Sequence, residues 1–238
     1  MQLRYQKTIL DSKDEIEPVS SIGWTKGGKL HRMSVTSSRS RVLKVFDADG
    51  ECKDKFSTKP RQENQKQYVV QCAEFSPCGT KLAIAQSDNI VFVYKIGEEW
   101  GDKKSICNKF VQAAPVTCMV WPHSTPGDIF FGLTDGKVKV GRLKQNKSFT
   151  LNAGHEDAGC VDSICAEIPA STEQGQAKIL TGHAGMDGSW KGRVYKHIVC
   201  DEPRTEKLAQ IDFVPLALGW GVNIFVAGTG GVVQVRDP

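Results

Sequence analysis

The chain has 238 residues, of which 39% are hydrophobic and 24% are charged, and its formal net charge is +4. These values are ordinary for a globular protein, and the length is enough to bury a large core as one β domain or as part of a larger one. The small positive excess does not indicate a nucleic-acid partner, which would favour a clustered basic face. We expect no signal peptide and no membrane span, because residues 1–10 lack an apolar core and no apolar run reaches roughly 18 residues.

The first part of the chain reads as short strands separated by turns. Residues 1–10 alternate between apolar and polar side chains, which suits an edge strand or a strand that closes a sheet. A first group of strands is expected over residues 18–60, from the region of Trp24 to a tight Asp-Gly hairpin at residues 49–50 and the strand after it. The segment near residues 31–35 is poorly patterned, so its bounds are not predicted.

The clearest group of strands covers residues 68–111. Its turn at residues 76–79, Ser-Pro-Cys-Gly, has serine first, proline second and glycine last, as a type I turn prefers. Asp88 and Asn89 then separate two runs rich in valine, isoleucine, phenylalanine and tyrosine, which is typical of a hairpin. Four antiparallel strands are therefore expected here.

The rest of the chain repeats this arrangement less regularly. Groups of strands are expected over residues 115–153, with a hairpin at Asp135, and over residues 160–212. Residues 184–192 are expected to interrupt a hairpin of the second of these groups, because they resemble an insertion. The last group, residues 213–238, is one strand short of four.

A recurring pair of residues relates these groups. An apolar residue stands five positions before an aromatic one near the start of each group, and only the fourth group lacks the aromatic. The apolar members are Val19, Val70, Val116, Val161 and Pro215. Their spacing of 45 to 54 residues lies slightly above the roughly 40–45 residues of WD40 repeats, in which four strands form one blade. The sequence therefore predicts an all-β fold, a WD40-type β-propeller with about five blades in an incomplete ring, and residues 1–10 as a closing strand.

Two other architectures fit the sequence less well. Helical solenoids share this period, but apolar residues at a spacing of 3.6 are hard to find. An immunoglobulin-like sandwich has strands at short spacing and no long-period repeat.

Several residues are expected to stabilise the blades rather than to perform chemistry. They stand at first strands, at hairpins, or in the Gly-His pair before a first strand: Trp24, Phe75, Trp121, Trp220, Asp88, Asp135 and His155. His155 could also form an acid–base cluster with Glu156 and Asp157, but a hydrogen-bonding role within its blade is favoured.

The sequence predicts no cofactor, no metal site and no disulfide. The eight cysteines include no Cys-x-x-Cys pair, and the spacing of Cys72 and Cys78 does not suit zinc. The glycine-rich residues 228–231 lack the following helix and the Lys-Ser/Thr of a phosphate loop. Cys72 and Cys118 hold equivalent places in first strands, where a small side chain packs inside, so reduced thiols are expected.

The candidate binding segment is the loop at residues 97–102 together with the two lysines that follow it. It places an aromatic side chain among charges, an arrangement that can anchor a partner. The residues expected to bind a partner are Glu98, Glu99, Trp100, Asp102, Lys103 and Lys104. Trp100 could equally fold back over its own blade, and the sequence leaves these two roles open.

Several motifs resemble the amino-terminal propeller of the intraflagellar transport proteins. They are MQLRY (1–5), DKFSTKP (54–60), DNI (88–90), VYKIGEEWGDKK (93–104) and ICNKF (106–110). The resemblance implies a non-catalytic subunit of intraflagellar transport complex B that helps to build and maintain cilia. It implies other complex-B subunits as partners, including one with a calponin-homology domain, and a location in the cilium, at the ciliary base (basal body) and in the cytoplasm. Helical repeats follow the propellers in this family, so the chain is expected to be a fragment.

Two further functions stay open at this point. A generic cytosolic WD40 adaptor, such as a coat subunit or a ubiquitin-ligase receptor, would share only the fold. A propeller enzyme or metal-binding propeller would need acids and histidines that converge on the axis, and the sequence supplies no repeated set of them. We therefore expect no enzyme activity.

Overall fold

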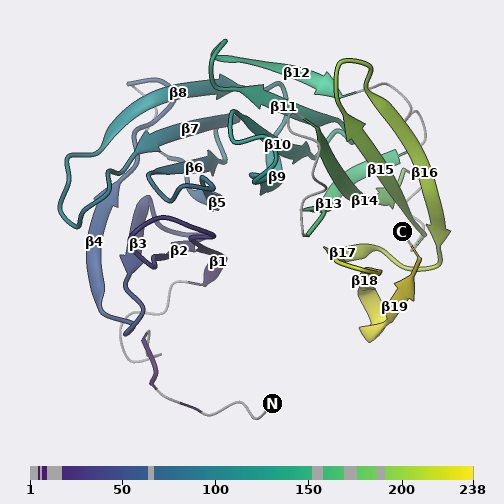
Figure 1. Cartoon of the computed structure of the whole chain (residues 1–238), viewed down its shortest axis with the longest axis horizontal. Helices are drawn as coiled ribbons and strands as arrows, with labels where there is room; N and C mark the ends of the chain where they lie inside the picture. Colours follow the sequence, from purple (N-terminus) through teal and green to yellow (C-terminus); the bar gives the residue numbers. More distant parts are fainter. Residues whose placement is uncertain are drawn as a thin grey trace.

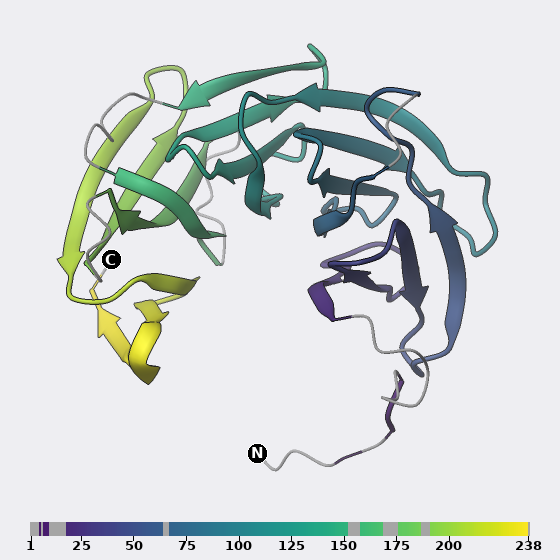
Figure 2. The same cartoon turned by 180° about the vertical axis from the view of Figure 1, so that it is seen from behind.

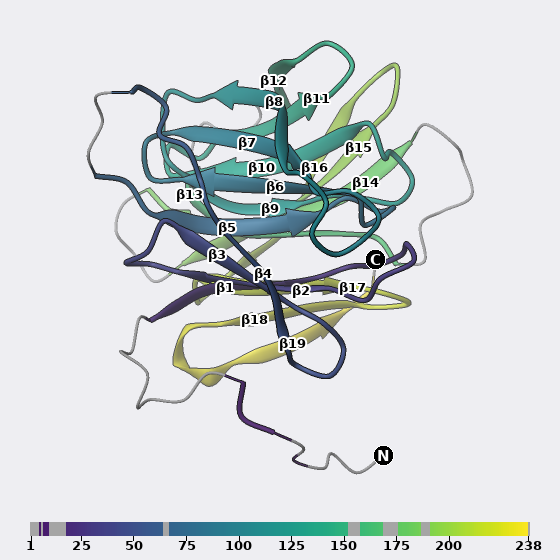
Figure 3. The ribbon, with the colours of Figure 1, turned by 90° about the vertical axis from the view of Figure 1, so that its left-hand side faces the viewer.

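The structure is a computed structural model that describes residues 5, 7–9, 18–63, 67–151, 158–168, 176–186 and 191–237. Its strands form five separate antiparallel sheets that stand side by side in an open arc (Figure 1). The same opening is seen from behind (Figure 2), and in the side view the first and last sheets overlap in projection along the same edge of the molecule (Figure 3). The prediction of an all-β, incomplete propeller with about five blades is confirmed.

Each of the first three sheets consists of four consecutive strands. The first contains β1 (Val19–Trp24), β2 (Met33–Ser37), β3 (Val42–Phe46) and β4 (Cys52–Ser57). The second contains β5 (Val70–Phe75), β6 (Lys81–Gln86), β7 (Ile90–Lys95) and β8 (Ser105–Val111). The third contains β9 (Val116–Val120), β10 (Asp128–Leu133), β11 (Val138–Arg142) and β12 (Lys147–Leu151).

The last two sheets complete the arc. The fourth contains β13 (Ala158–Ala166), β14 (Ala177–Gly185), β15 (Gly192–Val199) and β16 (Arg204–Ile211). The fifth contains β17 (Pro215–Trp220), β18 (Ile224–Gly228) and β19 (Val233–Arg236), with the short 3-10 turn η1 (Thr229–Gly231) before β19. The first strand of each sheet lies nearest the centre of the arc, and each fourth strand lies on the outer rim (Figure 1). Within the described ranges, no helix has the length and apolar character needed to cross a membrane.

The tight turns of the second and third sheets repeat one geometry. In the predicted turn at residues 76–79, the backbone N–H of Gly79 donates to the carbonyl of Ser76 at 2.9 Å, and Gly79 has a φ of +72°. The hairpin turns that end at Asn89 and Gly136 have the same type of bond, with φ values of +62° and +80°. Because positive φ favours glycine and asparagine, these residues fix where each hairpin turns.

The expected interruption at residues 184–192 falls where β14 is followed by β15, and residues 187–190 lie outside the described residues. β14 and β15 pair without a register shift from Ala177 opposite Val199 to Ala184 opposite Gly192. The pairing is therefore regular as far as residues 184 and 192, and the interruption between them stays a prediction.

Four hydrophobic clusters fill the junctions between neighbouring sheets. At each junction, residues in or next to the first strand of one sheet share a cluster with the middle strands of the sheet before it. Phe75 of β5 shares its cluster with Leu43 and Val45 of β3, and Trp121, which follows β9, shares one with Val91 of β7. Phe75 and Trp121 are fully buried, so the recurring aromatic of the sequence pattern binds one blade to the preceding one.

Strand β6 shows why the middle strands read as continuous apolar runs. Leu82 and Ile84 belong to the cluster shared with the first sheet, whereas Ala83 and Ala85 belong to the cluster shared with the third. Successive side chains of a strand point to opposite faces. Both faces of β6 are therefore apolar because both are covered.

The first sheet has one face that no other described sheet covers. Ile22 and Trp24 of β1 are 55% and 60% exposed, and Val35 and Met33, which pair opposite them, lie on the same face. Ile9 packs against the part of this face formed by the β2 and β3 residues. Trp24 therefore differs in its exposure from the buried first-strand aromatics, and its role in stabilising a blade stays a prediction.

The described residues of the N-terminal segment, Tyr5 and 7–9, form no strand. Lys7 forms an ion pair with Glu51 in the turn before β4, and Ile9 contacts the open face of the first sheet. Most of the expected closing strand, residues 1–10, lies outside the described residues. Its pairing with the last sheet stays a prediction.

The last sheet also leaves one apolar face open. On β18, Ile224 and Val226 are buried against the fourth sheet, whereas Phe225 between them is 46% exposed. Val235 of β19 pairs opposite Phe225 and is 57% exposed. An apolar face is therefore found at each end of the arc, one on either side of the opening (Figure 1).

We predict that the 238-residue chain associates with itself as its concentration rises, because each end of the arc presents an apolar face. Static light scattering measures the mass. The Trp24→Lys, Phe225→Lys double variant should stay monomeric over the same range, since it places a charge on both faces. Phe149→Lys, which changes an exposed aromatic on the outer strand β12, should associate like the parent. A parent chain that stays monomeric at every concentration would contradict the prediction.

Candidate functional site

The candidate binding loop joins β7 to β8 on the second sheet, and its backbone depends on glycine. Gly97 and Gly101 have φ values of +81° and +83°. A Cβ added at Gly97 would clash with the side chain of Asp102, so the loop has room only for glycine there. The sequence Gly-Glu-Glu-Trp-Gly-Asp therefore fits a tightly folded loop rather than an open one.

Asp102 holds the first half of this loop in place. Its Oδ2 accepts hydrogen bonds from the backbone N–H groups of Glu98 and Glu99, at 3.0 and 3.1 Å. A carboxylate that accepts two backbone N–H groups forms stronger bonds than a neutral acceptor would. Asp102 is thus a structural residue of the loop, with Oδ2 of its carboxylate bound by two backbone donors.

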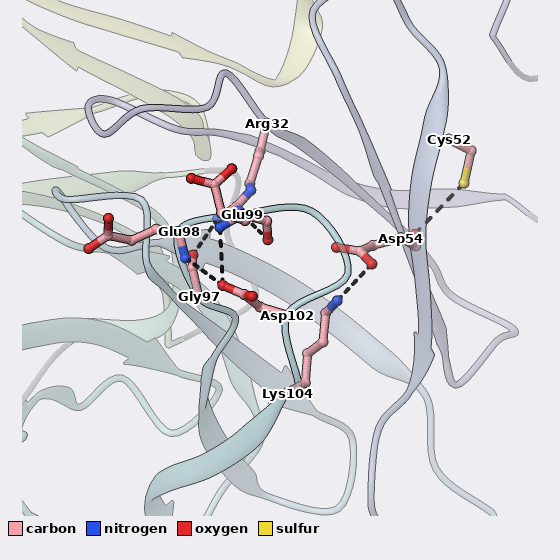
Figure 4. A network of polar contacts seen from close by, with 8 residues as sticks. All are labelled: Arg32, Cys52, Asp54, Gly97, Glu98, Glu99, Asp102 and Lys104. Carbon is pink, nitrogen blue, oxygen red and sulfur yellow. Dashed lines mark hydrogen bonds and ion pairs between the residues drawn. The ribbon is translucent and has the colours of Figure 1, made fainter.

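Arg32 attaches the loop to the first sheet. It lies just before β2 and is only 3% exposed. One terminal nitrogen of its guanidinium donates to the carbonyls of Gly79 and Gly97, both at 2.9 Å, and the other donates to the carbonyl of Glu99 at 3.2 Å. Figure 4 shows this side chain reaching the loop from the neighbouring sheet.

The indole of Trp100 is covered by the same guanidinium. The Cζ atom of Arg32 lies 5.1 Å from the centre of the Trp100 ring, within the range of a cation–π contact. Trp100 is half-buried and packs against the cluster between the first and second sheets. Of the two roles that the sequence left open, the geometry favours packing between blades over an exposed anchor.

Carboxylates around Arg32 offset the cost of burying its charge. Burial lowers the pKa of the Arg32 guanidinium from its ordinary value, while Asp54, Asp102 and Glu99 act in the opposite direction. Asp54 of β4 also receives a bond of 2.7 Å from Nζ of Lys104, and both of these side chains are largely buried (Figure 4). Lys104 is therefore a second attachment of the loop to the first sheet.

The surface that the loop offers to a partner is charged. Glu98 and Glu99 are exposed, and Nζ of Lys29 lies 3.3 and 3.8 Å from their carboxylates. Lys103 is also exposed. Exposed ion pairs of this kind contribute little to stability, so these side chains remain available for binding.

The described residues that were expected to stabilise the blades lie between sheets or in hairpin turns, except Trp24. Phe75, Trp121 and Trp220 are buried between sheets, and the indole N–H of Trp121 donates to the carbonyl of Pro126 at 3.0 Å. Two aspartates stand in hairpin turns: Asp88 accepts the N–H of Arg61 at 2.8 Å, and Asp135 accepts the N–H of Lys137 at 3.2 Å. His155 lies outside the described residues, as do Glu156 and Asp157.

Arg32 is the functional-site residue that sequence reasoning missed. It lies in the poorly patterned segment near residues 31–35, and its partners are backbone carbonyls, which leave no pattern in side-chain types. No pattern of side-chain types in the segment Arg-Met-Ser-Val-Thr-Ser marks Arg32 as part of the site.

Two possible chemistries find no support in the described part of the chain. No group of three or more histidine, cysteine, aspartate or glutamate residues there is placed to hold a metal ion. Burial raises the pKa of the Cys118 thiol to about 11 and that of Cys165 to about 12, so both are protonated thiols at neutral pH.

The open arc of blades and the packing of each first strand on the blade before it define the class: an incomplete β-propeller of the WD40-like type. No family model matches the chain. Over its whole length, however, the chain is a relative of intraflagellar transport protein 172. This confirms the resemblance seen in the sequence motifs.

Three relatives show the extent of the similarity. Intraflagellar transport protein 172 of Chlamydomonas reinhardtii is 41% identical over 241 residues, which cover 100% of the chain and 13% of the relative. The human homolog is 38% identical over 232 residues, or 95% of the chain and 12% of the relative. Intraflagellar transport protein osm-1 of Caenorhabditis elegans is 40% identical over 153 residues, or 63% of the chain and 8% of the relative. The chain thus spans only 8–13% of the length of these relatives.

We predict that Arg32→Ala lowers the free energy of unfolding by about 2–4 kcal/mol, because three carbonyls lose their donor and Trp100 loses its cover. Urea unfolding followed by tryptophan fluorescence measures the change. Lys29→Ala is the matched control on the same surface and should change stability by less than about 0.5 kcal/mol, since its ion pairs are exposed. Equal, small effects of the two substitutions would show that Arg32 does not attach the loop.

Proposed function

We propose that the chain is a non-catalytic interaction scaffold, the propeller part of an intraflagellar transport protein of complex B that serves cilium assembly and maintenance. The observation that carries this proposal is the identity of 38–41% to proteins named intraflagellar transport protein 172, over 95–100% of the chain. A generic WD40 adaptor would share the fold without such an extended identity. The proposal extends to a location in the cilium, at the ciliary base and in the cytoplasm.

The arrangement of the loop supports a binding role. Its backbone is fixed by Asp102 and Arg32, while Glu98 and Glu99 point their charges to solvent. A rigid loop loses little conformational entropy when it binds, which favours affinity. We therefore assign partner binding to the exposed charges of the loop, with Trp100 as their support.

The partners in this proposal are other complex-B subunits, including the subunit with a calponin-homology domain. The two adjacent glutamates favour a basic patch on the partner, because complementary charges direct the encounter and fix its orientation. Because Lys29 and Lys103 flank the glutamates, the matching partner surface has a basic centre with acidic groups beside it.

We predict that the tagged chain recovers complex-B subunits from ciliated cells, and that the Glu98→Lys, Glu99→Lys variant recovers at least tenfold less of them. Immunoblotting against individual subunits measures the recovery, and thermal melting shows that the variant is folded. The matched control is Asp201→Lys, Glu202→Lys, which makes the same charge change at exposed positions between β15 and β16. Recovery of no complex-B subunit by the parent chain would contradict the proposed function. An equal loss with the control variant would contradict the assignment of the loop.

A further inference from the structure

The geometry points to a second binding site, a groove on the outer rim that takes an extended peptide with alternating apolar and acidic side chains. The groove has a volume of about 560 Å³. One wall is the segment 59–63, which follows β4, and the other wall is β8 of the second sheet. No residue of the loop at 97–104 lines it, so this site is independent of the one proposed above.

The first wall is fixed to the second sheet. The backbone N–H of Lys59 donates to the hydroxyl of Tyr94 at 3.1 Å, and the backbone N–H of Arg61 donates to Oδ2 of Asp88 at 2.8 Å. Phe56 of β4 also packs on Tyr94, with ring centres 5.4 Å apart. The segment is therefore held at a set distance from β8, and the groove exists before a ligand binds.

The floor of the groove is apolar. Ile90 and Phe92 of β7 lie at its base, and Ile106 of β8 is half-buried beside them. Val111 pairs opposite Ile90 and is 48% exposed, although it lies on the same face as these buried side chains. An exposed valine over an apolar floor gains from being covered by another apolar side chain.

Both sides of the groove carry exposed positive charge. Lys59 and Arg61 stand on the first wall, and Lys109 stands on β8 opposite Phe92. The one acid among the lining residues is Glu63. The lining thus holds three basic groups against one acidic group, which favours an acidic ligand and opposes a basic one.

The shape of the site fits an extended chain. The groove follows β8, and Asn146 from the third sheet lines it and accepts the N–H of Lys109 at 3.1 Å. In an extended peptide successive side chains point to opposite sides. Alternate apolar side chains can therefore cover Val111 and Ile106, while the acidic side chains between them reach the basic groups of the rim.

The test uses two fluorescein-labelled peptides of eight residues, one alternating leucine with aspartate and one alternating leucine with lysine. Fluorescence anisotropy with the whole chain should show binding of the aspartate peptide that weakens as salt is raised, and at least tenfold weaker binding of the lysine peptide. Lys109→Glu and Arg61→Glu, one on each wall, should each weaken binding of the aspartate peptide about tenfold. Lys207→Glu is the matched control, because this exposed lysine lies on the outer strand β16 of the fourth sheet, and it should bind like the parent.

Three results would overturn the proposal. The first is that neither peptide binds at concentrations up to about 1 mM. The second is that the two peptides bind equally well. The third is that Lys207→Glu weakens binding as much as the groove variants do. If one of the two groove variants melts at a lower temperature than the parent, the binding measured with the other variant tests the proposal. Since the loop variant Glu98→Lys, Glu99→Lys leaves this groove unchanged, it should still bind the aspartate peptide. Failure at one site is thereby distinguished from failure at the other.

Discussion

The packing of each first strand on the middle strands of the preceding sheet is the contact on which the rest of the structure depends. A four-stranded antiparallel sheet has two faces, and each face is buried only where another element packs against it. Stacking in an arc covers both faces of the second, third and fourth sheets. The candidate binding loop and the outer groove both lie at the junction of the first and second sheets, so their geometry follows directly from this contact.

The sequence predicted the elements that depend on local chemistry. First strands follow from the recurring pair of an apolar and an aromatic residue, and turns follow from residues such as Gly79 and Asn89 that accept positive φ. It could not predict contacts between sheets that leave no local pattern. Arg32 binds carbonyls of two distant turns, the groove joins residue 59 to β8, and the exposure of Trp24 depends on what lies across the opening.

The two candidate binding sites use the same scaffold in different ways. At the loop, the buried guanidinium of Arg32 and the carboxylate of Asp102 fix the backbone so that exposed glutamates stand at a defined place. At the groove, two backbone hydrogen bonds fix a wall so that apolar and basic side chains face the same space. One site presents negative charge and the other positive charge, which suits a scaffold that holds different partners at once.

The most direct test of this account compares the stability of Trp121→Ala and Trp24→Ala by urea unfolding. Both remove a tryptophan from an equivalent place at the end of a first strand, but one is buried between two sheets and the other is 60% exposed at the end of the arc. We expect a loss of about 3–5 kcal/mol in the free energy of unfolding for Trp121→Ala and of less than about 1 kcal/mol for Trp24→Ala. Equal losses would contradict the account, because Trp24 would then have to be buried by a neighbour in solution.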